Sequence, residues 1–169
     1  AADYTSAKNI VGHGGSAGGM LMGAVANRAG ELFAGIVAEV PFVDVLNTML
    51  DDTLPLTPPE WPEWGNPITS DKDFRTILAY SPYENVAAKD YPAILAMGGL
   101  TDPRVTYWES AKWVARLRAT MTSGGPVLLR TNMGAGHGGA SGRFDRLDEV
   151  ALAYAFALWA VKRDRPSAD

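Results

Sequence analysis

Three residues that could do hydrolytic chemistry each follow a stretch of apolar residues. Ser16 lies in the run Gly-Gly-Ser-Ala-Gly at residues 14–18, which matches the G-x-S-x-G pattern of a nucleophile held on a tight strand-to-helix turn. Asp102 comes a few residues after another apolar run, and His137 stands in a loop of glycines after a further one. A serine, an aspartate and a histidine can together attack an acyl carbon.

Each of these side chains has a defined task in that chemistry. The hydroxyl of Ser16 would attack, His137 would take its proton and return it to the leaving group, and Asp102 would hold the imidazole in the right tautomer. The backbone N–H of Ala17 would face the developing oxyanion. The order Ser, Asp, His along the chain is that of α/β hydrolases. A histidine among glycines has little around it to pack against as a core residue.

Other interpretations of the same residues stay open. Gly12, Gly14 and Ala17 also fit a loose G-x-G-x-x-A dinucleotide fingerprint, with Glu39 as the ribose carboxylate. The glycines could instead serve a close contact between helix and sheet. Asp102 taken alone could be a helix N-cap before Val105. The three residues taken together favour the hydrolase, and a dinucleotide site is the weaker alternative.

Strand-like runs alternate with helical patterns, which indicates an α/β fold with a mostly parallel sheet of about four strands flanked by helices. The runs are residues 9–13, 34–40, 91–97 and 127–131, and the helical patterns are residues 20–28, 43–50, 71–80, 106–120 and 144–162. Residues 51–70 contain five prolines and two tryptophans, so we expect a long irregular segment with a functional role. In such sheets the function gathers beyond the carboxyl ends of the strands.

Composition excludes several classes of protein and of site. The 169 residues carry 19 acidic and 15 basic side chains, and the net charge of −4 gives no reason to expect nucleic acid as a partner. Without cysteine there is neither a disulfide nor a thiolate zinc site, and two histidines alone make a poor metal site, so no cofactor is expected.

Targeting and membrane signals are also missing from the sequence. The longest apolar run, residues 150–161, is too short to span a bilayer, and the first residues do not form a signal peptide. The lack of cysteine fits a reducing compartment, and we expect a cytoplasmic protein with no membrane partner.

Five blocks of sequence resemble the prolyl oligopeptidase family of serine peptidases, in particular its oligopeptidase B branch. They are GGSAGG at 14–19, AEVPFVDV at 38–45, EWGNP at 63–67, YSPYENV at 80–86 and GHGG at 136–139. The resemblance covers nearly the whole chain from Tyr4 to the final helix. It implies that Ser16, Asp102 and His137 are the catalytic triad of an α/β hydrolase.

The resemblance also implies a substrate, namely short peptides cleaved after Lys or Arg. An acidic residue that receives the basic side chain in that family corresponds to Glu60. A second family acid corresponds to Pro62, a departure from the pattern, although Glu63 beside it is retained. Arg104 resembles a family arginine that contacts a substrate carbonyl.

Relative to the family, residues 1–169 look like the C-terminal part of the catalytic domain. The N-terminal β-propeller and the first hydrolase strands would be absent, and with them a tyrosine that supplies the second oxyanion donor. The strand before Ser16 would then have an open edge, so we expect self-association or pairing with the missing N-terminal segment. Two further functions stay open: hydrolysis of small esters only, or a catalytically incompetent fragment that acts as an interaction module.

Overall fold

Four strands form one parallel sheet in the computed structural model, which describes residues 4–163. The strand order is β1-β2-β4-β6. The strands are β1 (Ile10–Gly15), β2 (Phe33–Glu39), β4 (Ala93–Gly99) and β6 (Val127–Asn132). All three neighbouring pairs run parallel, in a register that places Ile36 opposite Ile94. The prediction of a mostly parallel sheet of about four strands is confirmed.

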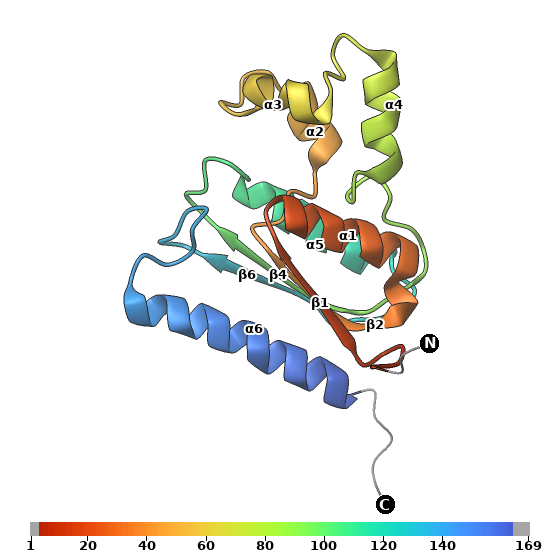
Figure 1. Ribbon diagram of the computed structural model, residues 1–169, viewed down its shortest axis with the longest axis vertical. Helices are drawn as coiled ribbons and strands as arrows, with labels where there is room; N and C mark the ends of the chain where they lie inside the picture. Colours follow the sequence, from red (N-terminus) through yellow and green to blue (C-terminus); the bar gives the residue numbers. More distant parts are fainter. Residues whose placement is uncertain (1–3, 164–169) are drawn as a thin grey trace, which may run out of the picture.

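Helices cover both faces of this sheet and extend beyond one end of it (Figure 1). Helices α1 and α5 lie on one face and α6 on the other, while α2, α3 and α4 form a separate layer above the sheet in that view. The helices are α1 (Ala17–Ala29), α2 (Val45–Leu50), α3 (Thr57–Trp64), α4 (Asp71–Tyr80), α5 (Tyr107–Thr120) and α6 (Arg143–Arg163), with a short 3₁₀ helix η1 (Gly30–Leu32) after α1. Two short strands, β3 (Asp90–Tyr91) and β5 (Ser123–Gly124), pair separately.

The two central strands are buried on both faces, which explains why their sequences are continuously apolar. Ile36 of β2 belongs to a cluster with Trp113 of α5, on one side of the sheet. Its neighbour Val37 belongs to a cluster with Phe156 of α6, on the other side. Because side chains alternate along a strand, each face needs its own covering helix.

Two predicted elements differ from the structure by more than a shift of their ends. Residues 51–70 are not irregular throughout, because they contain α3, which begins with Thr57, Pro58 and Pro59. The first N–H groups of a helix have no acceptor, so prolines in that turn cost no hydrogen bond. The predicted strand 91–97 is divided at Pro92, which has no N–H to donate: Tyr91 ends β3 and Ala93 begins β4.

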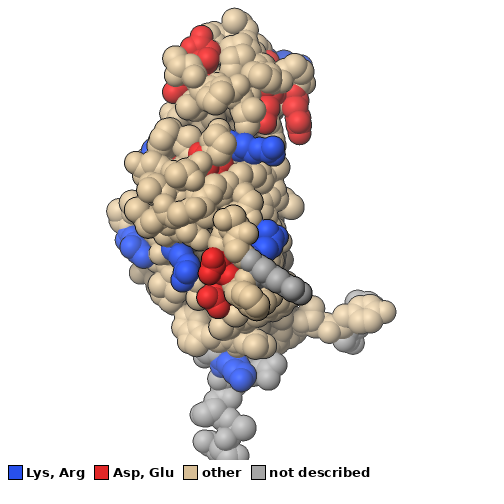
Figure 2. Space-filling model, turned by 90° about the vertical axis from the view of Figure 1, so that its left-hand side faces the viewer, with Lys and Arg blue, Asp and Glu red and all other residues tan. Residues whose placement is uncertain are grey.

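The β1 strand is an edge of the sheet among residues 4–163, as expected from the sequence. Residues 1–3 and 164–169, the two ends of the predicted 1–169 domain, lie outside the described residues. No helix within the described part is long and apolar enough to cross a membrane. On the face that Figure 2 shows, basic and acidic side chains are scattered and form no large patch of one sign.

Candidate active site

Ser16 stands on a sharp turn between β1 and α1. Its backbone has φ 55° and ψ −120°, a region that non-glycine residues rarely adopt, and such strain is typical of a nucleophile elbow. A Cβ on Gly14 would lie 2.3 Å from the carbonyl oxygen of Gly18, so glycine is required there. The helix begins at Ala17, three residues earlier than predicted, because the turn passes directly into it.

The two glycines on the helix side of the turn have different surroundings. A Cβ on Gly18 would meet nothing within 4 Å, so this glycine of the G-x-S-x-G pattern is not needed for close approach. The tight contact falls one residue later, where a Cβ on Gly19 would lie 2.6 Å from Cα of Pro41. The first helical turn therefore packs directly on the segment that follows β2.

A chain of hydrogen bonds joins the three residues singled out from the sequence. Nε2 of His137 lies 3.1 Å from Oγ of Ser16, and Nδ1 of His137 lies 2.8 Å from Oδ2 of Asp102. The Asp102 side chain is fully buried, and that of His137 is one-fifth exposed. The structure thus brings together residues that are 121 positions apart in the sequence.

Asp102 is not the helix N-cap of the alternative interpretation, because Thr106 holds that position before α5, but its side chain does bond to the turn that precedes the helix. Its Oδ1 accepts hydrogen bonds from the backbone N–H groups of Arg104, at 2.8 Å, and Val105, at 3.1 Å. The two oxygens of one carboxylate therefore have separate tasks, since one fixes the turn before α5 and the other faces His137. This arrangement holds the carboxylate in a single orientation.

The glycine-rich loop that carries His137 is fastened to its surroundings on two sides. A Cβ on Gly99, at the end of β4, would lie 2.5 Å from the carbonyl oxygen of Ala135, so the two backbones are in close contact. Glu149 of α6 accepts hydrogen bonds from Nδ2 of Asn132, at 2.7 Å, and from the N–H of Ala140, at 3.1 Å. Glu149 therefore ties both ends of the loop to α6.

Ala17, the predicted oxyanion donor, lies at the start of α1. As the first residue of α1 it follows Ser16 directly, and its N–H has no acceptor within the helix. The N–H of Ser16 itself is engaged, because it donates to the carbonyl oxygen of Glu39 at 2.9 Å. The positive end of the α1 dipole lies at the same point and favours negative charge.

A cavity of about 300 Å³ opens beside Ser16. One wall comes from the segment from Thr48 to Trp64, which includes α3, and the other from residues 103–106 and Glu109. The predicted binding residues Glu60, Glu63 and Arg104 all line this cavity together with Ser16 and Ala17. The structure therefore gathers every residue that the sequence singled out for substrate binding at one site.

These binding residues have different surroundings. Glu60 is half-buried, and its Oε2 accepts a hydrogen bond from Nε1 of Trp64 at 3.0 Å. Glu63 and Arg104 are exposed. Pro62 lies inside α3, between the two acids. The cavity thus carries two carboxylates on one helix, one of them oriented by an indole.

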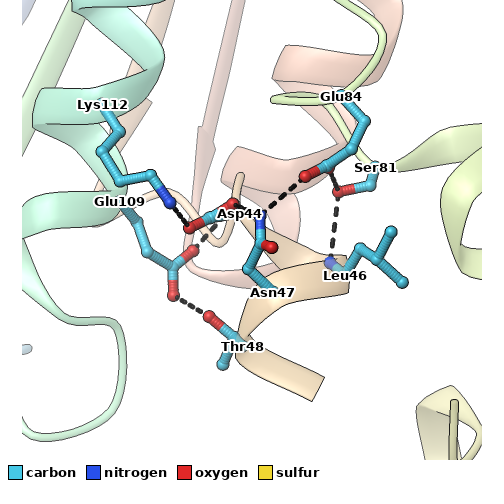
Figure 3. A network of polar contacts seen from close by, with 8 residues as sticks. All are labelled: Asp44, Leu46, Asn47, Thr48, Ser81, Glu84, Glu109 and Lys112. Carbon is cyan, nitrogen blue, oxygen red and sulfur yellow. Dashed lines mark hydrogen bonds and ion pairs between the residues drawn. The ribbon is translucent and has the colours of Figure 1, made fainter. Parts of the chain in front are cut away.

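A third acid of the cavity wall, Glu109, was not singled out from the sequence. Its side chain is fully buried, and burial raises its pKa from 4.5 to about 8. Oε2 accepts a hydrogen bond from the N–H of Asp44 and Oε1 one from the hydroxyl of Thr48, both at 2.9 Å (Figure 3). The sequence does contain a signal for this burial. Glu109 precedes Trp113 and Leu117 by four and eight residues, and this spacing places it on the buried stripe of α5.

The other histidine and the weaker alternatives can be placed as well. His13 is half-exposed near the end of β1, and its Nε2 lies 2.9 Å from Oε1 of Glu39. Glu39, considered above as a ribose ligand, thus contacts His13 in this structure. Within residues 4–163 no group of three or more His, Asp or Glu side chains could hold a metal ion.

Comparison with known proteins gives the family. The sequence profile of the prolyl oligopeptidase family matches residues 1–164. The chain belongs to the prolyl oligopeptidase family. It is 57% identical over 156 residues to Protease 2 of Moraxella lacunata, an alignment that covers 92% of this chain and 22% of that protein. It is 54% identical to dipeptidyl aminopeptidase BI of Pseudoxanthomonas mexicana, with 92% and 21% covered.

Solved structures agree with this assignment. Oligopeptidase B from Leishmania major superimposes with a TM-score of 0.92 at 46% identity, covering 95% of this chain and 22% of that one. The α/β-hydrolase fold and the resemblance to oligopeptidase B, both predicted from the sequence, are thereby confirmed. The chain spans about a fifth of the length of the relatives it matches.

Proposed function

We propose that the chain is a serine hydrolase that acts through an acyl-enzyme on Ser16. The observation that carries this proposal is the hydrogen-bond chain from Ser16 through His137 to Asp102, built on a strained serine. Oγ of Ser16 attacks the acyl carbon while Nε2 of His137 takes its proton. His137 then donates this proton to the leaving group, and the same residues activate water to release the acid. Asp102 keeps Nδ1 of His137 protonated and stabilises the imidazolium.

The negative charge of the tetrahedral intermediate falls on an oxygen next to the start of α1. The N–H of Ala17 donates to this oxygen, and the helix dipole adds to the stabilisation. Family resemblance assigns a second donor to an upstream tyrosine. Loss of one such donor typically costs about 3–4 kcal/mol in the transition state. Activated esters, which need less stabilisation, are therefore the substrates hydrolysed most readily by residues 1–169 alone.

We propose short peptides as the substrates, with cleavage after Lys or Arg. The support is the acidic lining of the cavity beside Ser16, where Glu60 and Glu63 meet a side chain that enters from the acyl group. A cationic side chain there forms charge-assisted hydrogen bonds with carboxylates. Arg104 lines the same cavity and is the candidate donor to a substrate carbonyl.

Rates on two substrates test the proposal. Wild-type protein is assayed with p-nitrophenyl acetate and with an arginyl p-nitroanilide, and Ser16→Ala is the control for both. We expect both activities to vanish in Ser16→Ala, and Glu60→Gln to lower kcat/KM for the arginyl amide far more than for the ester. An arginine preference that survives Glu60→Gln would overturn the pocket assignment. Ester hydrolysis without amide hydrolysis would support the alternative of an esterase only.

A catalytically incompetent interaction module is the remaining alternative, and the open sheet edge among the described residues is the observation that favours it. The β1 edge within residues 4–163 presents unpaired backbone groups, as in sheets that bind another strand. We propose that this edge pairs with an upstream segment of the family's domain or with a second copy. A monodisperse monomer in light scattering that has full activity would overturn this association.

We also propose a cytoplasmic location. The support is compositional, because a chain without cysteine needs no oxidising compartment. Fractionation of the producing cells tests it, and recovery with an extracytoplasmic fraction would contradict it.

A further inference from the structure

The buried acid Glu109 has a position that its role in folding does not explain. It is one of the residues that line the cavity beside Ser16, together with Thr48, Glu60 and Glu63. Its residue surface is wholly inaccessible to water. An apolar residue would suit the surrounding core better, since its neighbours one and two turns on are Trp113 and Leu117.

The charged groups around Glu109 come from several elements (Figure 3). Asp44, on the segment before α2, donates its N–H to Glu109, while its own carboxylate pairs with Lys112 of α5. Because Asp44 is already neutralised by Lys112, Glu109 has no cation of its own among these contacts. The two carboxylates of α3, Glu60 and Glu63, line the other wall of the same cavity. The exposed Arg104 lines the same wall as Glu109.

We propose that Glu109 is a specificity-determining residue that loses its proton when a cationic side chain enters the cavity, and so adds a third negative charge to those of Glu60 and Glu63. The inference rests on the proposed preference for Lys or Arg. Both groups that hydrogen-bond to Glu109, the N–H of Asp44 and the hydroxyl of Thr48, can donate to a carboxylate. The ionised form of Glu109 therefore already has two hydrogen-bond donors within the protein.

The gain in cation affinity can be calculated, because loss of the Glu109 proton and binding of the cation are thermodynamically linked. With its pKa at about 8, Glu109 is mostly protonated in the empty cavity at pH 7. A nearby opposite charge lowers the pKa of a carboxyl by about 1–3 units. A pKa lowered to about 6 would make the bound state mostly ionised, and the same coupling strengthens cation binding about tenfold at pH 7. Binding then releases close to one proton.

Calorimetry with benzamidine, an amidinium cation, measures this proton directly. Titrations at pH 7 in phosphate and in Tris, which differ in ionisation enthalpy, give the number of protons released. Wild type should release close to one proton, and Glu109→Gln should release none from this position and bind about tenfold more weakly. Glu84→Gln is the matched control, because Glu84 belongs to the same polar network but does not line the cavity. It should release as many protons as wild type.

The outcomes separate this inference from the function on which it rests. Equal proton release by wild type and Glu109→Gln would overturn the role of Glu109 and leave the basic preference intact. No binding of benzamidine at all would overturn the basic preference, and this inference with it. The catalytic triad is present in every variant, so differences between the variants report on Glu109. Wild type at pH 9.5 provides a test that needs no variant, because Glu109 is then already ionised and the release should disappear.

Discussion

Replacing Glu109 by glutamine should make the protein more stable at neutral and alkaline pH. A carboxyl whose pKa rises on folding, here from 4.5 to about 8, binds its proton more tightly in the native than in the unfolded state. The contribution of Glu109 to stability is therefore greatest below pH 4.5, falls as the pH rises from 4.5 to about 8, and levels off above that. Glutamine resembles the protonated acid in shape and removes this dependence.

The difference in unfolding free energy between wild type and Glu109→Gln follows from the width of the pH range between the two pKa values. Each pH unit costs wild type up to about 1.4 kcal/mol relative to Glu109→Gln, which amounts to on the order of 5 kcal/mol above pH 8. Small domains are stable by only about 5–15 kcal/mol, so the difference is a large fraction of the total. Urea unfolding at several values from pH 5 to pH 9, followed by tryptophan fluorescence, measures it.

A second variant separates ionisation from hydrogen bonding. Glu109→Met also lacks the titrating group, so its stability relative to wild type should rise with pH at the same slope as that of Glu109→Gln. It should be lower throughout by about 1–3 kcal/mol, because the N–H of Asp44 loses its acceptor in a buried site. Stabilities of wild type and both variants that run parallel from pH 5 to pH 9 would refute the reasoning.

Three further substitutions test the geometry of the site. Asp102→Asn should lower ester hydrolysis by on the order of 10³–10⁴-fold, because Nδ1 of His137 loses the carboxylate that fixes its tautomer, and a loss below tenfold would contradict this role. Gly19→Ala should destabilise the fold by about 1–3 kcal/mol in urea unfolding, since its Cβ would lie 2.6 Å from Cα of Pro41. An unchanged unfolding midpoint would show instead that the segment around Pro41 moves to make room for the methyl group. Glu149→Ala should lower kcat by up to about 100-fold through misplacement of the His137 loop, with KM for p-nitrophenyl acetate unchanged, whereas a change in KM alone would argue against it.

The residues of the candidate triad could be found from the sequence because of where parallel strands end. Ser16, Asp102 and His137 each follow the carboxyl end of a different strand, and in a parallel sheet these ends share one edge. Local glycine patterns then indicated which loops carry the chemistry. The covering of the sheet on both faces followed in the same way from continuous apolar runs.

What the sequence did not reveal depends on contacts between distant segments. The prolines of residues 51–70 predicted irregular structure, yet Pro58 and Pro59 fall in the first turn of α3, where they are tolerated. Glu109 could be placed on the buried stripe of α5 by its spacing, but its bonds to Asp44 and Thr48 cross more than 60 positions. Such pairings have no local pattern.

The central claim is that Ser16 is a working nucleophile activated by His137. Incubation with a fluorophosphonate probe, followed by mass spectrometry of the digested protein, tests it most directly. The account predicts one adduct, on Ser16, which is absent in Ser16→Ala and forms far more slowly in His137→Ala. A folded wild-type protein that forms no adduct, or forms it elsewhere, would contradict the account.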